Sequence, residues 1–105
     1  MQKRFALKLV ASCALALSAT ATFAQDAIKV AAIVELSGGG VVSGTNFRDG
    51  LKLAVNEINA AGGILGKKIV TTTADTQTNP GIAKGLTQKA VDDGAFAIFG
   101  PVYSG

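Results

Sequence analysis

The sequence has no histidine and no tryptophan, and its only cysteine is Cys13. Without histidine it lacks the general base of Ser-His-Asp hydrolases and the commonest nitrogen ligand of zinc. It also lacks the spaced acidic residues of a calcium or magnesium loop. The residues therefore predict no metal site, no bound cofactor and no enzyme.

Residues 1–24 read as a segment of their own. Three basic residues precede an uncharged, alanine-rich run over residues 9–21, and the sequence Thr-Phe-Ala then places small residues at −3 and −1 of a cleavage site. This is the pattern of a secretory signal peptide, and a spanning helix would need about 20 apolar residues. We expect cleavage before Gln25, which would remove Cys13 and leave a mature chain without thiol chemistry.

The formal net charge of +3 belongs to that segment. Lys3, Arg4 and Lys8 are three of the ten basic residues, so residues 25–105 contain seven basic and seven acidic side chains. A balanced chain without a basic stripe does not favour binding to nucleic acid.

The mature part alternates between strand and helix patterns joined by short connections. The expected strands are nearly continuous apolar runs rich in β-branched or aromatic residues, and the expected helices have apolar residues at helical spacing. The strands are expected at 28–36, 69–74 and 95–99, and the helices at about 46–61 and 80–93. The β-α-β-α-β order predicts an α/β fold with a Rossmann-like parallel sheet and right-handed crossovers.

The first helix shows one apolar stripe and a glycine stop. Its end is predicted at Gly62-Gly63, because glycine enters the left-handed cap without a Cβ penalty. Ser43 or Thr45 is expected to cap its start, after a glycine-rich loop over Ser37–Gly44. The stripe, expected to be core, consists of Phe47, Leu51, Ala54, Val55 and Ile58.

The second helix has a strong start signal, because Asn79 is a favoured N-cap and Pro80 is well placed at the first helical position. The residues expected to face the sheet are Ile82, Ala83, Leu86, Ala90 and Val91. With a strand order of 2-1-3, the loops after the first and third strands would flank one crevice, where parallel sheets bind ligands.

Several residues near that crevice have two readings. Ser104 is either a helix N-cap or, with neighbouring N–H groups, a carboxylate ligand. Tyr103 either stacks on a ligand or covers its loop. Glu35 either meets an ammonium group or, the favoured reading, points to solvent. Asp75 and Asn79 are expected to cap local structure.

The glycines of Gly38–Gly44 resemble a dinucleotide-binding fingerprint only weakly. Their spacing is off by one, and the acidic residue at the end of the second strand, Asp75, lies 37 residues past Gly38 instead of about 20. A loop beside a small ligand is the favoured reading.

Taken together, the residues resemble the substrate-binding proteins of branched-chain amino acid ABC transporters, the Leu/Ile/Val-binding type. The resemblance covers residues 29–105. It rests on IKVAAIVELSG, on F-x-x-G-x-x-L-A-V-x-E-I-N-A-A-G-G-I-x-G-K-K, on D-x-x-x-N-P and on FGPVYSG.

The resemblance implies a type I periplasmic binding protein fold, a two-lobed clamp of which residues 25–105 would form the opening part of lobe one. It implies that Ser104 contacts the ligand carboxylate and that Tyr103 and Ser43 shape the pocket, although relatives often have an aromatic residue at the place of Ser43. In some relatives a disulfide joins the loop before the second helix to the loop after the third strand. In this chain Thr78 and Tyr103 stand near those two positions.

The expected function is non-catalytic capture of an amino acid or related small carboxylate in the periplasm, by a monomer that delivers it to a membrane permease. Two rivals stay open. One is a ligand-sensing receptor or regulator domain of the same fold, and the other is an exported enzyme with its catalytic residues beyond Gly105. Residues 1–105 alone are expected to lack the ligand groups of a second lobe.

Overall fold

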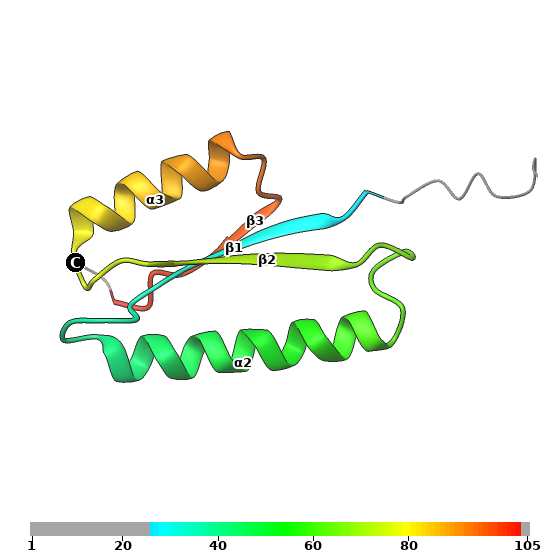
Figure 1. Cartoon of the computed structure of the whole chain (residues 1–105), viewed down its shortest axis with the longest axis horizontal. Coiled ribbons are helices and arrows are strands. Elements are labelled where there is room, and N and C mark those ends of the chain that lie inside the picture. Colours follow the sequence, from blue (N-terminus) through cyan, green and yellow to red (C-terminus); the bar gives the residue numbers. More distant parts are fainter. Residues whose placement is uncertain (1–25, 104–105) are drawn as a thin grey trace, which may run out of the picture.

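The computed structural model describes residues 26–103. Its elements follow the expected order (Figure 1). They are β1 (Ile28–Val34), α2 (Val41–Ala60), β2 (Ile69–Asp75), α3 (Pro80–Asp92) and β3 (Ala97–Phe99). The expected signal peptide at 1–24 and Ser104 lie outside the described residues.

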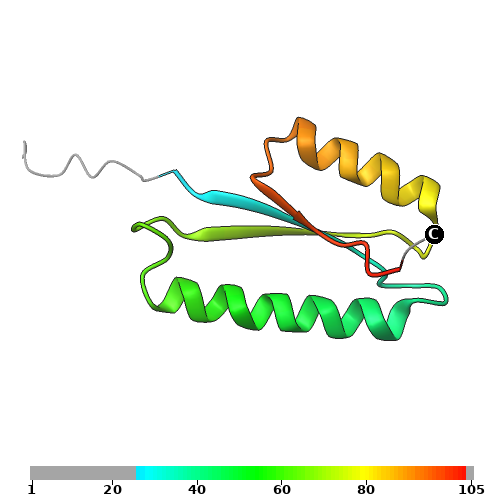
Figure 2. The same ribbon diagram turned by 180° about the vertical axis from the view of Figure 1, so that it is seen from behind.

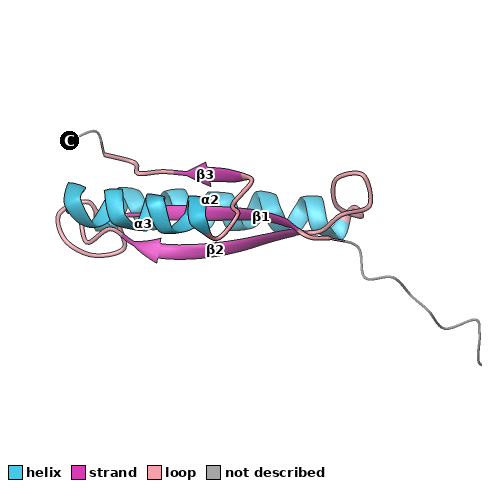
Figure 3. Cartoon of the chain, turned by 90° about the horizontal axis from the view of Figure 1, so that it is seen from above, coloured by secondary structure: helices cyan, strands magenta, loops and turns pink. Residues whose placement is uncertain are grey.

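The three strands form one parallel sheet, as predicted, and its order is β2-β1-β3, the order under which the loops after the first and third strands flank one crevice. Ile28 lies opposite Ile69, and Val30 lies opposite Ala97. The sheet is sandwiched between the helices, with α2 on one face and α3 on the other (Figures 1 and 2). Seen from above, β1 runs between its two neighbours (Figure 3).

The core is centred on β1. Residues 30–34 are at most 6% exposed, because this strand is paired on both edges and covered on both faces. This explains its nearly continuous apolar sequence. Ala83 and Ala90 of α3 are also buried. Val91, expected to face the sheet, is 57% exposed; it follows Ala90 by about 100° around the helix and so points away from the sheet.

Helix α2 begins at Val41, five residues before its expected start, so the predicted caps are wrong. Gly40 is the N-cap and no side chain caps the helix, while Ser43 lies inside the first turn. The reason is the close packing of Gly44, where an added Cβ would lie 1.8 Å from the carbonyl oxygen of Glu35. Only glycine lets the first turns of α2 lie against the end of β1.

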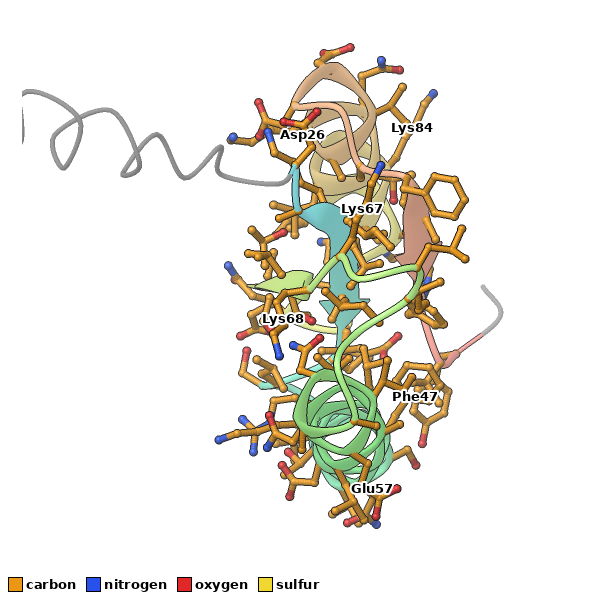
Figure 4. All side chains as sticks on the ribbon, turned by 90° about the vertical axis from the view of Figure 1, so that its right-hand side faces the viewer. Asp26, Phe47, Glu57, Lys67, Lys68 and Lys84 are labelled. Atoms are coloured by element: carbon orange, nitrogen blue, oxygen red, sulfur yellow. The ribbon has the colours of Figure 1, made fainter. Side chains whose placement is uncertain are left out.

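The apolar stripe of α2 is only partly core. Phe47 and Ile58 remain 38% and 36% exposed, and Ile58 lines an apolar groove of about 970 Å³ between α2, β1 and β3. Phe96 and Phe99 border the same groove. Figure 4 shows Phe47 on the β3 side of α2, whereas Glu57 points away from the sheet. Neither described helix is long and apolar enough to cross a membrane.

Candidate functional site

The predicted crevice lies at the carboxyl edge of the sheet. Because the strands are parallel, the loops that follow them end at one edge, on the left in Figure 1. These loops are residues 35–40 after β1, 76–79 after β2 and 100–103 after β3. The N-termini of both helices also lie at this edge. Ligands of open parallel sheets bind at such an edge.

Asp75 joins the first two loops. One carboxylate oxygen accepts hydrogen bonds from the N–H groups of Leu36 and Gln77, both at 2.8 Å, and the other accepts from the Ser37 hydroxyl at 2.6 Å. The Ser37 hydrogen bond, followed by that of Gln77, lowers the pKa of Asp75 below its ordinary value. These bonds confirm the expected structural role, and they also reach across to the neighbouring loop.

Thr78 makes a second connection between the same loops. Its hydroxyl donates to the carbonyl oxygen of Ser37 at 2.7 Å and accepts from the N–H of Gly40 at 3.0 Å. Thr78 adopts a left-handed backbone with φ 56°, which is uncommon for a β-branched residue. Next to it, Asn79 accepts from the N–H of Ile82 and caps α3, as its sequence predicted.

Glu35 lies inside the site, and the interpretation that it points to solvent is wrong. It is 2% exposed, and its two carboxylate oxygens accept hydrogen bonds from Val102 N–H at 3.1 Å and Tyr103 N–H at 3.2 Å. The loop after β3 folds back over the end of β1 and covers this side chain. Sequence reasoning missed the role because it depends on where that loop runs; the signal was an acidic residue ending an otherwise apolar strand.

Two of the three predicted ligand-binding residues come together. The Ser43 hydroxyl lies 3.5 Å from the Tyr103 hydroxyl, although 60 residues separate them in the chain. The Tyr103 ring also packs over Gly40, where an added Cβ would lie 2.8 Å from the ring carbon Cε2. Ser104, the third predicted residue, follows Tyr103 directly but lies outside the described residues.

A cavity of about 500 Å³ borders this cluster on the α3 side. Its walls include Glu35, Asn79, Lys84 and Tyr103. Tyr103 therefore stands between this cavity and the N-terminus of α2, where Ser43 lies. Within residues 26–103 no group of three histidine, cysteine or acidic side chains is arranged to hold a metal ion.

Comparison with known proteins agrees with this architecture. The model of a periplasmic binding protein family matches residues 27–105. The Leu/Ile/Val-binding protein BraC3 of Rhizobium johnstonii is 36% identical over 99 residues, covering 94% of this chain and 27% of its own. The Leu/Ile/Val/Thr-binding protein of Salmonella typhimurium is 39% identical over 97 residues, covering 91% and 26%.

A solved structure shows the same arrangement. The branched-chain amino acid transporter substrate binding protein LivJ of Streptococcus pneumoniae, determined in complex with isoleucine, superposes with a TM-score of 0.71 and 38% identity. The match covers 72% of this chain and 22% of that one. The chain thus spans about a quarter of the length of the curated relatives that it matches. It belongs to the periplasmic binding protein family, and its parallel sheet has the type I fold of that family.

Proposed function

We propose that this chain is part of the extracytoplasmic solute-binding component of an ABC importer. It captures an amino acid of the branched-chain type, or a related small carboxylate, and delivers it to a membrane permease without catalysis. The observation that carries this proposal is the family match over residues 27–105. The relatives named for binding Leu, Ile and Val support the choice of ligand class.

The ligand is bound at the carboxyl edge, between the loops after β1 and β3. Ser104 holds the ligand carboxylate, while Tyr103 and Ser43 shape the pocket. The contact between Ser43 and Tyr103 supports this assignment, because it brings both loops to one place. A serine hydroxyl beside free N–H groups is a suitable partner for a carboxylate.

In this proposal residues 1–24 are a signal peptide that is cleaved on export to the periplasm. Residues 25–105 form the N-terminal part of the first lobe of a monomeric ligand-binding domain. The chain spans about a quarter of the length of its relatives, which supports assigning it to part of one lobe. The remaining ligand contacts then come from elsewhere in the two-lobed protein.

A chimera tests the proposal with both lobes present. Residues 27–105 would replace the matching segment of the Streptococcus pneumoniae protein, and calorimetry would measure binding of L-isoleucine, other L-amino acids and aromatic acids. We expect binding of an aliphatic L-amino acid. We expect Ser104→Ala to weaken it about tenfold, since a hydrogen bond to a charged group would be lost.

Thr72→Ala is the matched control, because Thr72 is an exposed β2 residue remote from the carboxyl-edge loops and loses a hydroxyl of the same kind. It should bind as the parent chimera does. A folded chimera that binds none of these solutes would contradict the proposed function. Equal affinities of the parent and Ser104→Ala chimeras would contradict the assignment of Ser104.

A further inference from the structure

We propose that Glu35 is a positioning residue of this site: its buried carboxylate fixes the loop of residues 100–103, and with it Tyr103, against the N-terminus of α2. The proposal deepens the proposed function and rests on it for the role of Ser104. Glu35 itself does not touch the ligand. It acts by holding Val102 and Tyr103, the two residues whose N–H groups donate to its carboxylate.

The hydrogen bonds of Glu35 form a two-point clamp. One carboxylate oxygen accepts from the N–H of Val102 and the other from the N–H of Tyr103, so consecutive residues of the loop are held by one side chain. Hydrogen bonds to an ionised acceptor are stronger than bonds between neutral groups. Two of them fix both the position of the loop and its rotation about the side chain.

Burial makes this clamp costly to open. Glu35 is 2% exposed, and the described residues offer it no ion pair. A buried carboxylate without hydrogen bonds is strongly unfavourable. If the 100–103 loop moved away, the Glu35 carboxylate would lose both of its described donors. The cost of that loss holds the loop against Glu35.

Glu35 is itself held rigidly on the side of α2. The backbone of Gly44 packs against the Glu35 carbonyl group, and Gly40 lies so close that an added Cβ would be 2.9 Å from the Glu35 Cβ and Cγ atoms. The same helix start carries Ser43. Glu35 therefore joins the element that carries Ser43 to the loop that carries Tyr103 and leads to Ser104.

The chemistry requires an acid at this position. Two backbone donors face the side chain, and a carboxylate presents an acceptor to each. A glutamine of the same shape offers one acceptor and turns an amide N–H₂ toward the other donor. Glu35→Gln is therefore the informative variant, because it keeps the volume and removes one side of the clamp.

The first experiment measures amide hydrogen exchange by NMR in the full chain. In Glu35→Gln we expect the exchange of the Val102 and Tyr103 amides to rise about tenfold relative to the core amides of β1. We also expect loss of the nuclear Overhauser contacts between the Tyr103 ring and Gly40. Ile69→Val, a core change at the far end of the sheet, is the control and should raise exchange evenly instead.

The second experiment measures isoleucine affinity in the chimera described above. Glu35→Gln should weaken binding about tenfold, whereas Ile69→Val should leave it within about twofold although it also lowers the melting temperature. A purely structural role for Glu35 would lower the melting temperature and leave affinity unchanged, and that result would overturn the proposal.

The two proposals fail in different ways. A folded parent chimera that binds none of the tested solutes counts against the proposed function, while the exchange measurement still tests the clamp. Exchange of Val102 and Tyr103 that is unchanged in Glu35→Gln overturns the clamp whatever the affinity. If Glu35→Gln does not fold, the unmodified chain decides: its Val102 and Tyr103 amides must exchange at least about tenfold more slowly than that of Leu65, which is 94% exposed. Equal rates overturn the proposal.

Discussion

The carboxyl edge of the sheet and the apolar groove beside α2 are stabilised in opposite ways. At the carboxyl edge, Asp75, Thr78 and Glu35 each donate to or accept from the backbone of a neighbouring loop. In the groove, large apolar side chains stand open, and Phe96 is 83% exposed. The edge that should face a ligand is thus fixed by polar contacts, whereas the groove has hydrophobic surface and little burial.

This difference shows which kind of interaction fixes the position of a loop. Side chain to backbone hydrogen bonds are directional, so they set the positions of loops, which have no regular backbone hydrogen bonding of their own. Hydrophobic burial is non-directional and scales with the area removed from water, so an open groove contributes little to either stability or geometry. Changes at the two regions should therefore have very different effects.

The largest effect is expected where α2 meets the carboxyl edge. Gly44→Ala would place a methyl carbon 1.8 Å from the Glu35 carbonyl oxygen, a backbone atom that cannot rotate away. We expect a loss of about 3 kcal/mol in the free energy of unfolding, at the upper end of overpacking effects. Urea unfolding followed by circular dichroism measures it.

Gly50→Ala in the same helix is the matched control. A Cβ at Gly50 meets no atom within 4 Å, so alanine should stabilise the helix by up to about 1 kcal/mol. If Gly44→Ala were as stable as Gly50→Ala, the close packing of α2 on the end of β1 would be wrong.

A second contrast compares core and groove directly. Val34 of β1 is 0% exposed, and Val34→Ala should cost about 2 kcal/mol because it removes buried methyl groups and leaves a cavity. Phe96→Ala removes a larger side chain that is mostly in water, and it should change stability by less than about 0.5 kcal/mol. Thermal unfolding of both variants checks this. A loss of stability in Phe96→Ala as large as that in Val34→Ala would show that the groove is covered in solution.

The fold followed from the sequence because its signals are local. The apolar run of β1, the Asn79-Pro80 start of α3 and the glycines after α2 each act within a few residues, and the β-α-β-α-β order then predicts a parallel sheet. Asn79 accepts from the N–H of Ile82 as a side chain cap should. Such signals survive any tertiary arrangement.

What failed depends on contacts between distant residues. The early start of α2 requires Gly44 to fit against Glu35, and the burial of Glu35 requires the loop of residues 100–103 to fold back. Neither shows in residue spacing. For the site, the topology and the resemblance brought Ser43 and Tyr103 together. The roles of both in ligand binding, and that of Ser104, stay predictions.

Thr78→Val tests the link between the first two loops. Valine keeps the shape of threonine but cannot donate to the Ser37 carbonyl or accept from the Gly40 N–H. We expect a loss of about 1–2 kcal/mol, since two hydrogen bonds vanish and both backbone partners lose the Thr78 hydroxyl. Differential scanning calorimetry measures the loss. Thr72→Val on exposed β2 is the control, and equal stabilities of the two variants would show that the Thr78 link does not hold the loops.

The smallest effect is confined to acid. The hydrogen bonds of Asp75 lower its pKa in the folded chain below the ordinary 3.8, so its contribution to stability is complete above that value. It is lost as the pH falls from about 3.8 through the lower folded pKa, because over this interval the unfolded chain binds a proton that the folded carboxylate does not. Melting temperatures measured between pH 2 and about 6 should therefore fall more steeply at the acid end for the parent chain than for Asp75→Asn. The two proteins should differ most above pH 4, and parallel curves over the whole range would show that Asp75 does not hold the two loops through its charge.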